Sequence, residues 1–125
     1  MNARTLLNSV HAVVPAMLQK NSGKIITIGA NAARQGMAHM GVYCASKSMV
    51  MRLTESMSAE LRGQGININC VMPSIIDTPE NRAAMPKANY DNWVAPEQLA
   101  AVILFLASDA ASAVHGALVP VTGLS

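Results

Sequence analysis

Tyr43 and Lys47 are the two residues of this sequence whose types and spacing most directly suggest acid–base chemistry. They stand four positions apart in a segment with helical periodicity, so their side chains project from the same face of a helix. An ammonium group beside a phenol stabilises the phenolate and lowers the pKa of the phenol from its usual value of about 10. Such a pair can act as a general acid or base, although a packed tyrosine beside a solvated lysine has the same spacing.

The elements that position this pair alternate between helices and short strands. Apolar residues at helical spacing predict helices over residues 4–20, 42–62 and 97–107. Short apolar or β-branched runs predict strands over residues 24–29, 66–72 and 117–121. This alternation is typical of a parallel sheet covered by helices, so the predicted fold class is α/β.

Two loops that are distant in the sequence are expected to form one site. In open parallel sheets, ligands bind outside the carboxyl ends of the strands. The loops after Gly29 and after Met72 leave such ends, so both are expected to face a common ligand. The second loop, residues 73–95, has three prolines and little periodicity, which indicates a long functional loop or a helical lid.

Composition excludes several classes of function. Of the 125 residues, 51% are hydrophobic and 13% are charged, which excludes a disordered chain. A net charge of +2 without a basic run argues against nucleic acid as a partner. The longest apolar run, residues 99–107, is too short to span a membrane. Cys44 and Cys70 form no CxxC pair and the histidines have no ligand-like spacing, so we expect a cytoplasmic protein without a metal site.

Several motifs together resemble the short-chain dehydrogenase/reductase family, and the resemblance runs from Asn2 to the C-terminus. In chain order the motifs are GKIITIG, YCASK, VMPSIIDT, LFLASDAAS and two glycines, Gly116 and Gly123, that frame the last predicted strand. The resemblance implies a doubly wound Rossmann-type fold that binds NAD or NADP. It also implies an oxidoreductase that transfers hydride between the nicotinamide and a small-molecule substrate.

The resemblance implies roles for three residues near the predicted acid–base pair. Tyr43 would donate or accept a proton, and Lys47 would hold the nicotinamide ribose and lower the pKa of Tyr43. Asn2 stands where the family has a catalytic asparagine, although a terminal residue without a catalytic role would occupy the same position.

The resemblance extends to cofactor contacts and to assembly. The loop that begins at Pro73 would contact the nicotinamide, with Ile76 through its backbone and Thr78 through its hydroxyl. The helices over residues 4–20 and 42–62 would form the interface of a homo-oligomer.

Two departures from the family pattern affect the predicted activity. The family's catalytic serine, thirteen positions before the tyrosine, is replaced by Ala30. No G-x-G-x-x-G sequence occurs, so the chain lacks the Gly-rich loop that binds the diphosphate of a dinucleotide. We therefore expect residues 1–125 to be a single truncated domain, the C-terminal half of the fold, that is inactive by itself. The alternative is a non-catalytic remnant that acts only as an assembly module.

A second resemblance bears on the substrate and on Ala30. The segments GANAARQGM and DTPENRAAMPKANYDNW resemble dihydropteridine reductase and its bacterial relatives, which share the alanine. This resemblance implies a quinonoid pterin that is protonated by Tyr43 and is reduced at a position where there is no carbonyl group for a serine to hold. Alternatively, Ala30 marks a loss of activity toward simple carbonyls. Trp93 and Met85 would equally fit the packing of a lid, and Arg82 would fit a solvated loop charge.

Overall fold

A three-stranded parallel sheet forms the centre of the computed structural model, which describes residues 2–125. Its strands are β1 (Gly23–Ile28), β2 (Ile66–Pro73) and β3 (Leu118–Val121), and they lie in the order β1-β2-β3. Every residue of β2 is buried, because this strand lies between two paired neighbours and is covered by α2 on one face and α4 on the other. The parallel order confirms the α/β class predicted from the alternation of elements.

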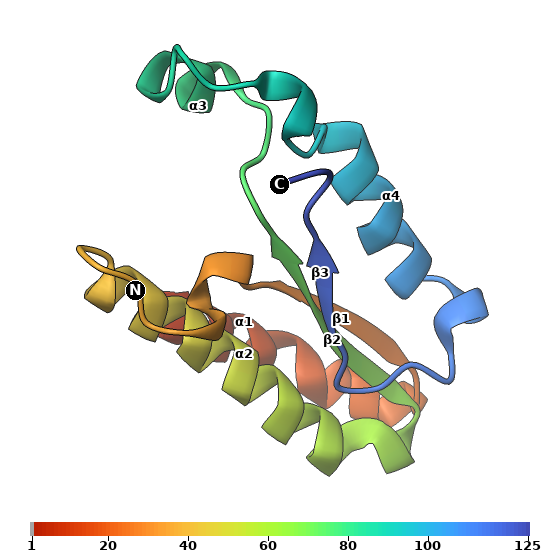
Figure 1. Cartoon of the computed structure of the whole chain (residues 1–125). Coiled ribbons are helices and arrows are strands. Elements are labelled where there is room, and N and C mark those ends of the chain that lie inside the picture. The colour runs from red at the N-terminus through yellow and green to blue at the C-terminus, as the bar shows by residue number, and fades with distance from the viewer. Residues whose placement is uncertain (1) are drawn as a thin grey trace.

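Helices cover both faces of this sheet. α1 (Asn2–Lys20) and α2 (Gly41–Leu61) lie side by side on one face, and α4 (Pro96–Leu106) lies on the other (Figure 1). Each face has its own buried apolar cluster, with Met57, Ile66 and Ile68 on the first and Val71, Val94, Leu99 and Leu106 on the second. Among residues 2–125, no helix combines the length and the apolarity that a membrane span requires.

The predicted helices and strands all occur, with ends that differ from the prediction by one or two residues. Residues 73–95, which we call the lid segment, contain the short helix α3 (Pro79–Ala84) and a 3-10 turn at Tyr90–Asn92. Figure 1 shows α3 at the top of the molecule, beyond the end of β2. Residues 73–95 therefore form a long loop that carries one short helix, and the role of this segment as a lid stays a prediction.

Gly65 sets the direction in which the chain enters β2. Its φ is +76°, a left-handed conformation that favours glycine. A Cβ atom at this position would overlap the backbone carbonyl of Asn21, in the turn between α1 and β1. The chain thus leaves α2 and enters β2 only because this residue has no side chain.

Two buried asparagines of β2 hold the segment that leads into β3. The Asn67 amide donates to the carbonyl oxygens of Ser112 and Val114 at 2.8 and 2.9 Å. The Asn69 amide also donates to Val114 O at 3.0 Å, and its Oδ1 accepts from the Ala117 N–H at 2.9 Å. Because buried polar groups are stable only when hydrogen-bonded, these contacts fix the path of the chain beside β2.

Candidate active site

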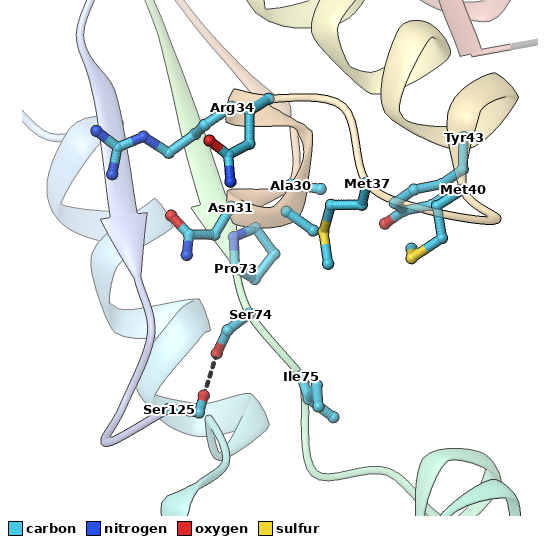
Figure 2. Close-up of a pocket in the computed structure, with 12 residues that line it drawn as sticks. Ala30, Asn31, Arg34, Met37, Met40, Tyr43, Pro73, Ser74, Ile75 and Ser125 are labelled. Carbon is cyan, nitrogen blue, oxygen red and sulfur yellow. Dashed lines mark hydrogen bonds between the residues drawn. The ribbon is translucent and has the colours of Figure 1, made fainter.

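The carboxyl ends of β1 and β2 open into a cavity of about 800 Å³. Its lining comes from the loop after β1, the first turn of α2, the residues directly after β2 and Ser125. Figure 2 shows Asn31 and Pro73 next to each other in the lining of this cavity, with Met37 and Tyr43 further along it. The two loops predicted to face a common ligand therefore do meet at one site.

The loop after β1 is anchored tightly before it reaches the cavity. The Gly29 N–H donates to Val71 O at 2.8 Å, which extends the pairing of β1 and β2 by one residue. A Cβ atom on Gly29 would lie 2.9 Å from both Cys70 Sγ and Met51 Cγ, so any side chain here would require these two neighbours to shift. Ala30 follows with 4% of its surface exposed, and its methyl group joins the apolar cluster around Met51.

Tyr43 and Lys47 lie in the first two turns of α2, at the carboxyl end of β1. The Tyr43 side chain is 44% exposed and forms part of the cavity lining. Lys47 Nζ donates to the backbone carbonyl oxygen of Ile28, the last residue of β1, at 3.3 Å. An ammonium group has three donors, so two remain for a ligand. The predicted pair is thus placed where a parallel sheet binds its ligands.

Asn2 lies next to this pair without touching it through any hydrogen bond in the described part of the chain. Its Nδ2 donates to Ser46 Oγ at 3.0 Å, so the start of α1 is bound to the residue that precedes Lys47. Sequence reasoning missed this contact, because Ser46 stands in the YCASK motif as one small residue among several. The structure thus places Asn2 against Ser46 of α2 and outside the lining of the cavity; its catalytic role stays a prediction.

The lid segment begins directly at the site. Pro73 is buried and lines the cavity. The Ile76 carbonyl oxygen accepts a hydrogen bond of 2.7 Å from Asn81 Nδ2, and the Thr78 hydroxyl accepts one of 3.2 Å from the Asn81 N–H. Within residues 2–125, no group accepts a hydrogen bond from the Ile76 N–H. The role of Asn81 was missed in the sequence, although Thr78 followed by Pro79 and, three residues later, a polar side chain is a helix-start signal.

A stack of side chains organises the rest of the lid segment. Arg82 forms a two-bond ion pair with Asp77, at 2.6 and 2.8 Å, and its guanidinium lies 4.5 Å from the centre of the Tyr90 ring. The Tyr90 and Trp93 rings follow, with centroids 4.8 Å apart, and Trp93 is only 7% exposed. The hydrogen bond from Arg82 lowers the pKa of the Asp77 carboxyl. Arg82 is 51% exposed, as expected for a solvated loop charge, and it is paired with Asp77. The packing interpretation of Trp93 is confirmed.

The two cysteines are structural in this arrangement. Both are free and buried, and burial raises the pKa of the Cys70 thiol. Cys44 lies between the two members of the acid–base pair in sequence, but its Sγ faces Ala32 O at 3.8 Å, within the core. Among the described residues, no group of three or more His, Cys, Asp or Glu side chains could hold a metal ion.

Lys47, Ile76 and Thr78, which lie outside the lining of the cavity, carry donor groups suited to one end of a nicotinamide dinucleotide. The remaining donors of Lys47, the Ile76 N–H and the Thr78 hydroxyl are the kinds of group that bind ribose and carboxamide oxygens. The chain contains no Gly-rich loop at a helix N-terminus to bind the diphosphate. The fit therefore covers the nicotinamide end.

A parallel sheet with helices on both faces and a cavity at its carboxyl edge is the arrangement of the doubly wound α/β folds, which include the Rossmann-type fold. Comparison with known proteins then identifies the family. The family model described as enoyl-(acyl carrier protein) reductase matches residues 1–123. The chain belongs to the short-chain dehydrogenase/reductase family.

Relatives with known names support this assignment. The chain is 31% identical to the 3-oxoacyl-(acyl-carrier-protein) reductase of Thermotoga maritima, over 98% of this chain and 53% of the relative. It is also 31% identical to dehydrogenase/reductase SDR family member 6 of Danio rerio, over 98% of this chain and 56% of the relative. The chain thus spans about half the length of the curated relatives that it matches.

Solved structures agree with the sequence comparison. A gluconate 5-dehydrogenase from Burkholderia cenocepacia, in complex with NADP and tartrate, superposes with a TM-score of 0.87 at 29% identity. The match covers 98% of this chain and 52% of that one. The similarity in fold therefore extends over nearly all of the described residues.

Proposed function

We propose that this chain carries the proton-transfer and nicotinamide-contacting part of an NAD(P)-dependent oxidoreductase. The observation that carries the proposal is the position of Tyr43 on the wall of the cavity, with Lys47 one turn later bound to the end of β1. A parallel sheet binds its ligands at this edge. The family membership and the NADP bound to a similar structure support the same function.

Tyr43 and Lys47 divide the proposed chemistry between them. When bound, the dinucleotide supplies or accepts the hydride. Tyr43 gives its phenolic proton to the substrate in the reducing direction and takes a proton in the oxidising direction. Lys47 stabilises the phenolate that this transfer leaves, and its bond to Ile28 O keeps the ammonium group at the end of β1.

The cavity supports a flat, polar heterocycle of the pterin kind as substrate. Met37, Met40 and Pro73 give the cavity apolar surfaces on which a planar ring can pack. Asn31 and Ser74 add polar groups to the same lining. Ala30 offers no hydroxyl to a substrate carbonyl, which agrees with a ring that is reduced at a C=N bond.

A titration with reduced nicotinamide mononucleotide tests this proposal directly. This probe carries the nicotinamide and its ribose without the second half of a dinucleotide. We expect saturable shifts of the backbone amide NMR signals of residues 43–47 and 76–78, and weaker binding by Tyr43→Phe and Lys47→Ala. Shifts scattered over the surface, or no shifts, would contradict the proposal.

The dinucleotides provide the matched comparison. Since the chain has no site for the diphosphate, NADH and NADPH should bind no more tightly than the mononucleotide. We expect no measurable dinucleotide binding at micromolar concentration by calorimetry. A micromolar dissociation constant would show that residues 1–125 are sufficient for cofactor binding and would exclude the assembly-only alternative.

A second candidate function is assembly, because α1 and α2 expose several apolar side chains. α1 has no buried residue, although it lies directly against α2. Leu7, Val13, Val42 and Met49 are exposed by 48%, 41%, 88% and 52%. We propose that two copies of the chain pair through these helices, since exposed apolar patches mark contact surfaces.

Sedimentation equilibrium distinguishes assembly from a monomeric chain. The unmodified chain should form a homodimer, and Val13→Lys should shift it to monomer. Lys20→Ala, at an exposed site on the same helix, serves as the control and should leave the dimer intact. A monomer at every concentration of the unmodified chain would exclude this second candidate.

A further inference from the structure

Asn81 makes contact with both of the residues of the lid segment that are predicted to touch the nicotinamide. Its Nδ2 donates to Ile76 O at 2.7 Å, and its backbone N–H donates to Thr78 Oγ1 at 3.2 Å. One residue therefore engages an acceptor on each of them. The two bonds come from different groups of Asn81, so the side-chain bond can be removed while the backbone bond is kept.

The groups that Asn81 leaves open are mainly donors. The Ile76 N–H has no acceptor within residues 2–125, because the neighbouring backbone bonds run from Asp77 N to Val94 O and from Val94 N to Ile75 O. The Thr78 hydroxyl, which accepts from Asn81, keeps its own proton to donate. The Ile76 carbonyl has a second lone pair, but a new donor would have to reach it beside the Asn81 amide.

We propose that Asn81 is a positioning residue. By occupying the carbonyl oxygen of Ile76, it leaves the lid segment with mainly hydrogen-bond donors for the nicotinamide carboxamide. The inference rests on the proposed function. In this arrangement the carboxamide oxygen faces the Ile76 N–H and the Thr78 hydroxyl. The carboxamide NH₂ group gains little from Ile76 O, because Asn81 already occupies that acceptor. Asn81 itself need not touch the cofactor.

The preference between two mononucleotides measures this bias. Nicotinamide mononucleotide has both a carbonyl and an NH₂ group, whereas its 3-acetylpyridine analogue keeps the carbonyl and replaces NH₂ by methyl. We expect the unmodified chain to bind the two within about twofold of each other. Asn81→Ala frees Ile76 O for the NH₂ group, so it should favour nicotinamide mononucleotide by about threefold to tenfold, the effect of one hydrogen bond.

Two further variants separate positioning from folding. Asn81→Asp keeps the shape and the backbone bond but removes the side-chain donor, so it should also lose the near-equal binding of the two probes. Glu80→Ala changes the preceding exposed residue of α3 and should keep the near-equal binding. Circular dichroism spectra confirm that each variant is folded. A purely structural role of Asn81 would weaken both probes equally and leave their ratio unchanged.

Hydrogen exchange provides a measurement without any nucleotide. In the free chain, the Ile76 amide should exchange at least about tenfold faster than those of Asp77 and Val94, which are hydrogen-bonded. Nicotinamide mononucleotide should slow the Ile76 amide selectively. Slow exchange of Ile76 in the free chain, or a probe ratio that Asn81→Ala leaves unchanged, would overturn this inference alone. Failure of the unmodified chain to bind either probe would overturn the proposed function and this inference with it.

Discussion

Lys47 Nζ donates to the backbone carbonyl oxygen of Ile28 at 3.3 Å, so the helix that carries the acid–base pair is bound to the strand end that it serves. The contact uses one of the three ammonium donors. It also joins β1 to α2, which are separated in the sequence by twelve residues, 29–40. The Lys47 side chain thus both links α2 to the end of β1 and supplies a positive charge there.

Replacing this lysine should reduce ligand binding more than stability. Lys47→Ala removes charge-assisted hydrogen bonds to the ribose, so binding of reduced nicotinamide mononucleotide should weaken about tenfold. The thermal midpoint should change little, because Ile28 is 41% exposed and water can replace the lost donor. Calorimetry and thermal melts measure the two effects. An unchanged affinity would remove Lys47 from the binding site.

Acid should release the ion pair of the lid segment. Arg82 lowers the pKa of Asp77, so the pair stabilises the folded chain above the unfolded pKa of about 3.9 and loses this effect as pH falls through the lower folded value. The ¹³C shift of the Asp77 carboxyl should titrate below the normal range, and Arg82→Gln should return it to that range. Arg52→Gln, which removes a surface pair with Glu55, is the control and should have no effect on Asp77.

Restoring a serine at position 30 distinguishes substrate adaptation from loss of activity. If a longer enzyme carries this chain, Ala30→Ser in that enzyme should not raise turnover of a quinonoid dihydropterin, because that substrate is not reduced at a carbonyl group. The variant should also be less stable by about 1–3 kcal/mol unless the new hydroxyl finds a partner, since the site is 4% exposed. A large gain in turnover of ordinary ketones would instead mean that the alanine is a lesion.

The contacts of Asn69 should make a large contribution to stability. Asn69→Ala leaves the Ala117 N–H without its acceptor and removes one of the two donors to Val114 O. Leaving a buried polar group unsatisfied costs about 1–3 kcal/mol, so denaturant unfolding should show a loss of at least this size. Asn89→Ala, at an exposed turn, is the matched control. It should lower the free energy of unfolding by about 1 kcal/mol at most.

The order of helices and strands was predictable because it depends on local apolar periodicity. α2 illustrates this: apolar residues repeat along it at helical spacing up to the glycines at 63 and 65, and the observed helix ends at Leu61. The convergence of Tyr43 and Pro73 on one cavity also followed from a general rule, since parallel strands present their carboxyl ends at the same edge. These features need no knowledge of side-chain geometry.

The contacts within the lid segment were not predictable in the same way. The pairing of Arg82 with Asp77, and the bond from Asn81 to Ile76, depend on how the chain turns at Thr78 before α3 begins. Sequence spacing alone does not tell whether such side chains point into solvent or bind another residue. The bond between Asn2 and Ser46 is similar, because it joins two helices whose packing no local pattern encodes.

The burial of Trp93 has a practical consequence. It is the only tryptophan in the sequence, and it lies in the lid segment beside Tyr90. Intrinsic fluorescence excited near the red edge of protein absorption therefore reports on this one segment and not on the sheet. The emission spectrum therefore reports the surroundings of the lid segment while the rest of the protein contributes no signal.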